Sequence, residues 1–485
     1  MKKLLWLLVA LPLITFAQST SQTNIDFKIT EIYSTGYGPG NIVSADFNSD
    51  HVPDLALADN NGSTVSILLN AGLGDSSFST MNAFSVVNPV FIVAAYIDAD
   101  TNADIAVATI FNLNYYITIY LGAGDGITFT PTDTAYALDG PPKWMAIADF
   151  NRDSFLDLAT ANSSDAPNGG TINILQGLGA AGFGPAVSYD AGTYPSSLDT
   201  GDFNGDNYPD LAVTNLGDNT VNVFLFTGQA TPGQSSYMGF QGVPSTYPTG
   251  VEPWCIKTGN FNNDKYMDFV VANSGDGTIN IYLNNQDSVG TFLPSINDTI
   301  SRNGNLWSVI AADFNRDSIQ DLAITSRDSG LTVLKGLNTG HFAKVWNYSD
   351  TLVSYTPLYF PLFLIAQDLN NDSLPDITVV NHTRNNLVVF KDTTYLHTVP
   401  NSARSSIFSV SGSTVNVYPV PATELINVDS KYKIEKLTLY DIQGRVVVSS
   451  QQSSISVATL PAGIYLLYIT TSQGTIIKQV AVTTQ

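Results

Sequence analysis

Residues 202–214 read DFNGDNYPDLAVT, an acidic loop that runs directly into an apolar, strand-like segment. Six further copies of this pattern occur along the chain: DFNSDHVPDLALA (46–58), YIDADTNADIAVA (96–108), DFNRDSFLDLATA (149–161), NFNNDKYMDFVVA (260–272), DFNRDSIQDLAIT (313–325) and DLNNDSLPDITVV (368–380). Successive copies begin 50 to 58 residues apart, the period of one propeller blade or of a similar array unit. The chain is therefore predicted to contain seven copies of one structural unit.

The segments between the acidic loops are typical of a β-protein. Runs of β-branched and aromatic residues such as TVSILLN, YITIYLG and TVNVFLF alternate with clusters of Gly, Asn, Asp and Pro. No amphipathic stretch of helical period stands out after the first residues. The predicted fold class is all-β.

A second repeated signal predicts how the array closes. A phenylalanine opens another strand in each unit, shortly before the next acidic loop: Phe78, Phe129, Phe183, Phe240, Phe292 and Phe342. Phe27 is a seventh such residue, whereas the last unit ends at LVVFKDTTYL without one. We therefore expect residues 25–33 to supply the missing outer strand of the seventh unit. Such closure removes exposed sheet edges, which otherwise promote aggregation.

On these features the chain resembles the FG-GAP or VCBS repeats of integrin-α-type seven-bladed β-propellers. The matching unit is DFNGDNYPDLAVTN, followed by NTVNVFLF and a later Phe-led strand, and the likeness spans residues 25–396. The resemblance implies a seven-bladed propeller over residues 18–396. It also implies that the acidic loops share one face and that partners bind the opposite face.

The acidic loops have the chemistry of calcium sites. Oxygen ligands at positions one, three, five and nine of each loop can converge as the chain turns, with the carbonyl of position seven as a further ligand. The predicted ligands are Asp46, Asn48, Asp50 and Asp54; Asp98, Asp100 and Asp104; Asp149, Asn151, Asp153 and Asp157; Asp202, Asn204, Asp206 and Asp210; Asn260, Asn262, Asp264 and Asp268; Asp313, Asn315, Asp317 and Asp321; and Asp368, Asn370, Asp372 and Asp376. Up to seven structural calcium ions are expected.

The seven loops are not expected to be equal. Tyr96 replaces the first ligand of the second loop, and Asn260 lowers the charge of the fifth, so these two should bind calcium most weakly. The family resemblance also leads us to expect glycine at position six, where a left-handed turn is often needed, but no loop has one. The alternative is that the loops are Asx-rich hairpin turns without an ion.

The net charge of −22 follows largely from these loops. Six loops contribute three aspartates each at ligand positions and one contributes two, which makes 20 of the 42 acidic residues. With only 20 Lys and Arg and no basic cluster, nucleic acids and anionic membranes are not expected partners. The four histidines show no zinc-site spacing, and no GxSxG nucleophile motif occurs.

The two ends of the chain predict export. Residues 1–17 have the charged start, apolar core and small residue of a signal peptide, and the apolar run is too short to span a membrane. After a polar linker at 397–412, residues 413–485 resemble the type A C-terminal sorting domain of the type IX secretion system, a small Ig-like β-sandwich. The matching features are Tyr418-Pro419, Pro421-Ala422, LYDIQGRVV, Gly463-Ile464-Tyr465 and the terminal strand with Lys478. The resemblance implies contact with the outer-membrane export machinery of a Gram-negative bacterium and a secreted or surface location.

Three classes of function stay open at this point. The first is a calcium-binding adhesion module for a glycan or a protein, with Trp144, Trp254 and Trp307 on the face opposite the acidic loops as candidate ligand-binding residues. Because each Trp begins an inner strand, packing between blades is the alternative role for them. The second class is an extracellular hydrolase or lyase acting on polysaccharide or lipid, and the third is a structural surface or matrix protein.

Overall fold

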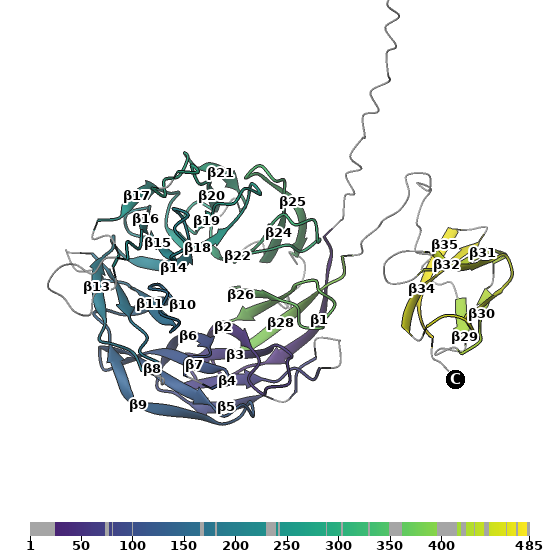
Figure 1. Cartoon of the computed structure of the whole chain (residues 1–485), viewed down its shortest axis with the longest axis horizontal. Helices are drawn as coiled ribbons and strands as arrows, with labels where there is room; N and C mark the ends of the chain where they lie inside the picture. The colour runs from purple at the N-terminus through teal and green to yellow at the C-terminus, as the bar shows by residue number, and fades with distance from the viewer. Residues whose placement is uncertain are drawn as a thin grey trace, which may run out of the picture. The chain divides into compact units, whose positions relative to one another are not determined.

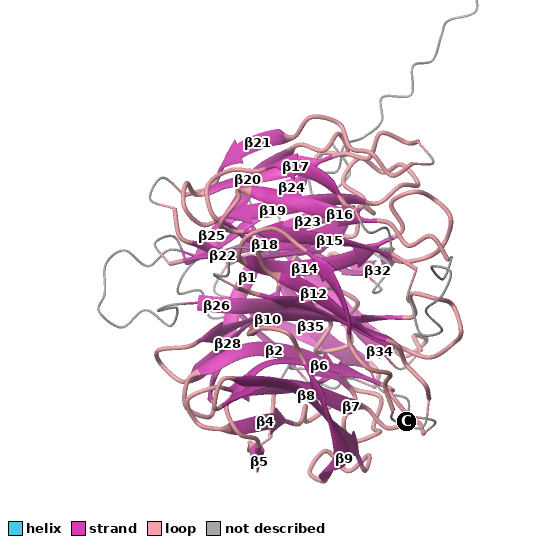
Figure 2. Ribbon diagram, turned by 90° about the vertical axis from the view of Figure 1, so that its left-hand side faces the viewer, coloured by secondary structure: helices cyan, strands magenta, loops and turns pink. Residues whose placement is uncertain are grey.

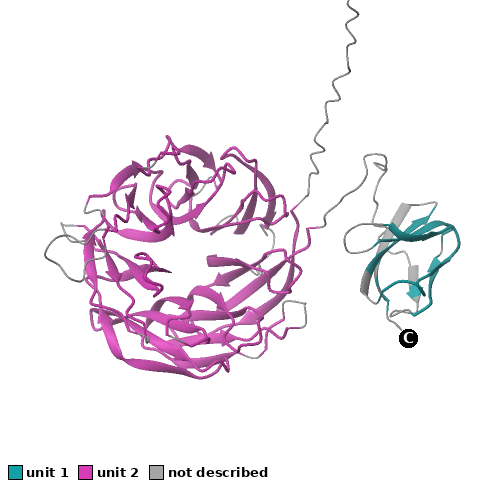
Figure 3. Ribbon diagram, viewed as in Figure 1, with its two compact units in different colours: residues 1–22, 396–485 teal, residues 23–395 magenta. Residues whose placement is uncertain are grey.

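A computed structural model describes residues 25–394, except 73–76, 80, 99, 165–168, 180–181, 229–238, 241–242, 288, 302–303, 328–329 and 349–360. It also describes residues 415–482, except 419–422, 431, 441–445, 462 and 472–473. The predicted signal peptide at 1–17 and the linker at 397–412 lie outside the described residues. The chain divides into two compact units, residues 23–395 and residues 1–22 with 396–485 (Figure 3). The described residues form strands, turns and loops and no helix, which confirms the all-β prediction (Figure 2).

The unit of residues 23–395 contains seven four-stranded antiparallel sheets arranged in a ring (Figure 1). The first three sheets are β2 (Pro39–Ala45), β3 (Asp54–Asp59), β4 (Thr64–Leu68) and β5 (Asn82–Ser85); β6 (Pro89–Ala95), β7 (Asp104–Phe111), β8 (Asn114–Gly122) and β9 (Phe129–Ala137); and β10 (Pro142–Ala148), β11 (Asp157–Asn162), β12 (Thr171–Leu175) and β13 (Val187–Asp190). The next three are β14 (Pro195–Gly201), β15 (Asp210–Asn215), β16 (Thr220–Phe224) and β17 (Ser245–Pro248); β18 (Pro253–Gly259), β19 (Asp268–Asn273), β20 (Thr278–Tyr282) and β21 (Ile296–Thr299); and β22 (Leu306–Ala312), β23 (Asp321–Ser326), β24 (Gly330–Gly336) and β25 (Phe342–Tyr348). The seventh is β26 (Pro361–Gln367), β27 (Asp376–Asn381), β28 (Asn386–Asp392) and β1 (Phe27–Ser34).

The ring closes as predicted, because the N-terminal strand β1 completes the seventh sheet. The outer strand β1 pairs antiparallel with β28, with Phe27 opposite Asp392 and Ser34 opposite Asn386. On the inner side, the first strand of each sheet contacts the first strands of its neighbours, and β26 contacts β2 to complete the circle (Figure 1). The first and last strands of this unit therefore lie in one sheet. Strand β1 covers the edge of β28, which would otherwise be unpaired.

The core lies between the sheets. The second strands of all seven sheets are buried along their length or nearly so, because each is covered on both faces by a neighbouring sheet. This explains why these strands appear in the sequence as continuous apolar runs such as DLAVTN rather than as alternating patterns.

Neighbouring sheets are joined by the hydrophobic residue at position two of each acidic loop, which packs against the Phe-led segment of the next sheet. The rings of Phe47 and Phe129 lie 5.8 Å apart, and those of Phe203 and Phe292 lie 5.4 Å apart, both edge to face. Phe314 packs in the same way against Phe27 of β1, so this contact also spans the ring closure. Edge-to-face pairs of this kind are each worth about 0.5–1.5 kcal/mol beyond their buried area.

One detail of the predicted strands is wrong. Phe78, Phe183, Phe240 and Phe292 do not open the outer strands but form isolated bridges ahead of them. Outer strand β5, for example, begins only at Asn82. Phe27, Phe129 and Phe342 do open their outer strands, as predicted.

The C-terminal unit has a core of its own. It consists of a three-stranded sheet of β29 (Val415–Tyr418), β30 (Leu425–Ser430) and β33 (Ser454–Ser456), and a four-stranded sheet of β32 (Val446–Ser450), β31 (Ile434–Tyr440), β34 (Gly463–Thr471) and β35 (Gly474–Val482). Residues from both sheets, among them Ile426, Leu439 and Leu467, form a single buried cluster. The Ig-like topology of this unit stays a prediction.

Among the described residues, no helix has the length and apolarity that a membrane crossing requires.

Candidate functional site

Five of the seven acidic loops share one closed geometry. In the loop that begins at Asp202, the two carboxylate oxygens of Asp202 accept hydrogen bonds from the backbone N–H groups of Asp206 (3.1 Å) and Asn207 (2.8 Å). The side-chain oxygen of Asn204 accepts from the same Asp206 N–H, at 2.9 Å, and Asp206 accepts from the N–H of Tyr208. The loops that begin at Asp46, Asp149, Asp313 and Asp368 repeat all four contacts. Side chains at positions one, three and five therefore fold toward the inside of the turn.

The same five loops are left-handed at position six although none has glycine there. The φ angles of His51, Ser154, Asn207, Ser318 and Ser373 lie between 65° and 73°. L-residues adopt this conformation at a cost, which is smallest for Asn, whereas the achiral glycine adopts it freely. The hydrogen bond from the position-six N–H to the first aspartate accompanies this conformation in every case.

The other two loops depart from this geometry at the places that the sequence singled out. Asn260 does not accept from the N–H groups of its loop but donates from its side chain to the carbonyl of Asp264. Lys265 and Thr101, at position six, are not among the left-handed residues of the described chain. With an amide or a tyrosine at position one, no carboxylate is available to accept the two N–H groups, so the turn does not close in the same way.

The aspartate at position nine has a structural role in every loop. Asp210 is fully buried, and its two oxygens accept backbone hydrogen bonds from Phe203, at 2.9 Å, and Phe226, at 2.7 Å. It thereby ties the loop to the end of the third strand. The other six loops likewise join their position-nine aspartate to the N–H at the end of the third strand. Burial raises the pKa of Asp210 to about 7 despite these two donors, so a nearby cation would stabilise its charged form.

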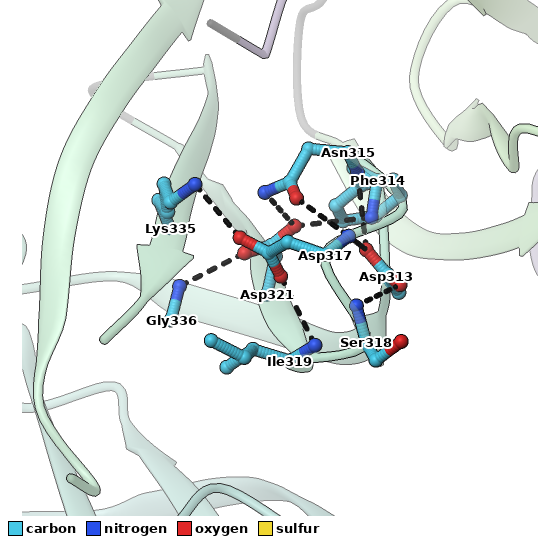
Figure 4. Close-up of polar contacts among 9 residues, drawn as sticks. All are labelled: Asp313, Phe314, Asn315, Asp317, Ser318, Ile319, Asp321, Lys335 and Gly336. Carbon is cyan, nitrogen blue, oxygen red and sulfur yellow. Dashed lines mark hydrogen bonds and ion pairs between the residues drawn. The ribbon is translucent and has the colours of Figure 1, made fainter. Parts of the chain in front are cut away.

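The sixth loop contains a cation from the protein itself (Figure 4). The ammonium nitrogen of Lys335, on β24, lies 2.8 Å from Oδ2 of Asp317 at position five. Both side chains are largely buried, with about a fifth to a quarter of their surface exposed (19% and 25%). Asp313 and Asn315 keep the closed-loop contacts beside this ion pair, and Asp321 accepts from the N–H groups of Phe314 and Gly336.

The predicted ligand sets fit a hard cation in their chemistry, because every side chain at the four positions offers oxygen. Across the described part of the chain, however, no three His, Cys, Asp or Glu side chains come together as a ready-made metal cluster. In particular, the carboxylate oxygens of the position-nine aspartate already accept hydrogen bonds from backbone N–H groups. The loops would therefore bind calcium through amide, carbonyl and carboxylate oxygens together, and calcium binding stays a prediction.

A cavity of about 420 Å³ opens at the opposite ends of the same strands. The acidic loops join the end of each first strand to the start of the second, whereas the cavity is lined by the starts of the first strands and by residues at the ends of the second strands. It therefore lies on the other face of the ring. Its lining is mostly apolar and includes Phe91, Trp144, Trp254, Phe363 and Tyr194.

The structure separates the three candidate tryptophans. Trp144 lines the cavity and packs against Phe91 and Phe363, with ring centroids 5.0 and 5.1 Å away. Trp254 also lines the cavity, whereas Trp307 packs edge to face against Trp254 at 4.9 Å without being part of the lining. All three are half-buried. Trp144 thus combines packing between sheets with a place in the cavity wall.

Comparison with known families agrees with this architecture. The sequence profile of FG-GAP-like repeats matches residues 149–213, 260–324 and 313–379, which include the predicted ligand positions of five of the acidic loops. Residues 149–213 and 260–379 of the propeller unit therefore contain FG-GAP-like repeats. The profile of the secretion system C-terminal sorting domain matches residues 416–483, which lie in the C-terminal unit. This domain indicates export to the cell surface or the extracellular space.

Solved structures resemble this chain in general form. Three of them are the BBS1N chain of a BBS1N–ARL6DN complex (12% identity, TM-score 0.49, covering 78% of this chain and 98% of that one), the periplasmic gluconolactonase of Pseudomonas aeruginosa (13%, 0.47, 93% and 100%) and a protein from Lactobacillus plantarum (13%, 0.44, 88% and 96%). At these values the likeness says nothing about function. No curated protein matches the sequence.

Several contributors to these sites were not predicted. The packing role of position two was visible as a repeated hydrophobic residue in every acidic loop, so that signal was present in the sequence. Nothing in the sequence connected Lys335 with Asp317 or brought Phe91 and Phe363 to Trp144, because these contacts join residues that are distant along the chain.

Proposed function

We propose that this protein is an exported, calcium-stabilised β-propeller that binds an extracellular glycan or protein on the face opposite its acidic loops. The aromatic cavity on that face is the observation that carries the proposal. A volume of about 420 Å³ falls within the ~300–1,000 Å³ of ordinary ligand pockets. Aromatic walls with a few polar groups suit a sugar ring or a protein anchor.

Calcium is assigned a structural role in this proposal. The five closed loops support it, because their side chains already face the inside of the turn and their position-nine aspartates hold the turn against the sheet. An ion in such a loop would neutralise the clustered carboxylates. It would not reach the cavity, which lies at the other ends of the strands.

The lining of the cavity favours binding over hydrolysis. Glycoside hydrolysis uses a pair of carboxyl groups beside the scissile bond. Among the described residues that line this cavity and a second one next to it, Asp139 is the one carboxylate.

A binding screen tests the proposal. The mature chain, with and without calcium, is applied to a glycan array and to extracts of surface proteins. Replacement of Trp144 or Trp254 by Ala is expected to weaken any binding by at least about tenfold, since both line the cavity and each tenfold loss corresponds to about 1.4 kcal/mol. Thermal melting shows whether each variant is folded. If both folded variants still bind the ligand, the ligand site lies elsewhere and the proposal is wrong.

A further inference from the structure

A second cavity of about 370 Å³ adjoins the first. The two share Lys143, Ser163 and Tyr194 in their walls. Their chemistry differs: the first is mostly apolar, and the second is lined by Tyr115, Asp139, Gly140, Pro141 and Ser164 in addition to the shared residues. The face opposite the acidic loops therefore has an aromatic cavity and a polar cavity that share three lining residues.

Tyr194 is held at this junction in an unfavourable backbone conformation. Its φ is 54°, a left-handed value that is uncommon for bulky residues. The residue before the first strand is also left-handed in four other sheets, where it is Gly38, Asn88, Glu252 or Asn305. Gly and Asn tolerate this conformation, whereas for Tyr it costs conformational energy.

The ring of Tyr194 lies beside Gly217 on one side, and 40% of the residue is exposed. Its carbonyl accepts a hydrogen bond from Leu216 N–H at 2.9 Å, which fixes the turn and would do so equally for glycine. The left-handed turn recurs in five sheets and belongs to the repeat, so Tyr194 is distinguished by its exposed aromatic ring in the walls of both cavities. The exposed part of the side chain is therefore available to a ligand at the junction of the two cavities.

The polar cavity carries hydrogen-bonding groups of both kinds. Lys143 is exposed and supplies N–H donors, while Ser163 and the tyrosine hydroxyls can donate or accept. Asp139 is exposed, and one of its oxygens accepts from Asn173, at 2.9 Å, and from Ser188. One ammonium group beside one carboxylate does not select strongly for a charged ligand. The net charge of −22 further disfavours polyanions.

We infer that the two cavities form one site for a neutral oligosaccharide, with Tyr194 as the platform between an apolar and a polar subsite. The inference rests on the proposed function and narrows its ligand to this class. A sugar ring offers an apolar face that packs on an aromatic ring, and its hydroxyl groups both donate and accept hydrogen bonds. A purely apolar ligand would leave the polar cavity unpaired, which is costly.

The test uses the mature full-length chain and short neutral oligosaccharides of glucose, xylose, mannose and galactose. Tyr194→Gly is expected to lower the affinity for the bound sugar at least about tenfold, and thermal melting checks that the variant is folded, since glycine tolerates the left-handed backbone. Glu252→Gly is the matched control, since Glu252 has the same φ of 54° and lines neither cavity. It should leave the affinity unchanged.

Lys143→Met is a second probe, because it removes the donor shared by the two cavities but keeps the length of the side chain. It should weaken sugar binding several-fold. If Tyr194→Gly binds the sugar as tightly as the wild type, the inference is wrong. If the protein binds a surface protein through Trp144 and Trp254 but no neutral oligosaccharide, the inference is wrong and the proposed function stands. If it binds no glycan and no protein, both fail.

Discussion

In each acidic loop, the aspartate at position nine is more deeply buried than the residues at positions one and five. Positions one and five lie at the surface turn, whereas position nine is completely buried and accepts two backbone hydrogen bonds in loops such as that of Asp210. Removing such an acceptor would leave two buried N–H groups unpaired, at a cost of about 1–3 kcal/mol each. The position-nine aspartate is therefore needed for the fold with or without an ion.

The buried aspartates predict how the metal-free protein responds to pH. Burial raises the pKa of Asp157, Asp210 and Asp321 to about 7, and that of Asp54 and Asp268 to about 6. A carboxyl group whose folded pKa exceeds its unfolded value stabilises the fold at low pH, and this contribution is lost as pH rises toward the folded pKa. With a chelator present, the melting temperature should be lower at pH 8 than at pH 5.

Calcium should reverse this order, because the ion binds the ionised carboxylates that exist at the higher pH. Thermal melts at both pH values, with chelator and with calcium, provide the measurement. A metal-free protein that is more stable at pH 8 would show that these aspartates keep ordinary pKa values.

Because of Lys335, we expect the sixth loop to bind calcium more weakly than the other closed loops. Its ammonium group already neutralises Asp317 at 2.8 Å. Lys335→Met should lower the stability of the metal-free protein by up to about 1 kcal/mol, since the pair is partly exposed, and should strengthen calcium binding to this loop. Lys344→Met, at an exposed position of neighbouring β25, is the control. Thermal melting of the metal-free protein measures the first effect, and calorimetric titration with calcium measures the second. An unchanged titration would show that Lys335 does not affect calcium binding.

At the scale of the elements, the joint between neighbouring sheets is the hydrophobic residue at position two. It places an aromatic or aliphatic side chain of one loop against the Phe-led segment of the next sheet, as in the pairs Phe150 with Phe240 and Phe261 with Phe342. In the loops that have Ile97 or Leu369 instead, this side chain shares one core cluster with the corresponding phenylalanine. The acidic loop is thus both a turn within its sheet and a contact to the next one.

Strand β1 carries the closure of the ring. A chain that begins at residue 36 lacks β1 and exposes the edge of β28, whose N–H and C=O groups can then pair with another molecule. It should melt at a lower temperature and elute partly as larger species in size-exclusion chromatography. A chain that begins at residue 24 keeps β1 and serves as the control. A monomer of unchanged stability without β1 would mean that the pairing of β1 with β28 is dispensable.

For the whole molecule, bound calcium is expected to account for a large part of the stability. Each site that is saturated at a hundred times its Kd adds about 2.7 kcal/mol. The chain has no disulfide, because its one cysteine, Cys255, is a free, buried thiol. Chelation should therefore lower the melting temperature markedly, and calcium should restore it. A melting curve that does not respond to chelator would contradict the calcium proposal.

Export is the second property of the whole molecule. The C-terminal unit has its own core, so it can be removed without opening the core of the propeller. Deletion of residues 413–485 should leave the protein in the periplasm, where cell fractionation would find it, while the full chain reaches the surface or the medium. Normal export of the truncated chain would refute a sorting role for this unit.

The sequence predicted the features that are local and periodic. The repeat in 202–214 and its six copies fixed the number of sheets, the buried second strands and the loop side chains, because one unit of sequence builds one unit of structure. Phe27 in turn indicated the closing strand, since a missing outer strand at one end matched a surplus strand at the other. The unequal loops at Tyr96 and Asn260 followed from the absence of a carboxylate at position one.

Only the tertiary structure decided which residues come together on the opposite face. Phe91, Trp144 and Phe363 come from three different first strands and meet because the closed ring points the starts of those strands inward. Tyr194 looked like one aromatic residue among many until its left-handed backbone and its place between two cavities were visible. Such contacts depend on the angles between sheets, to which every inter-sheet contact contributes. No single stretch of sequence encodes those angles.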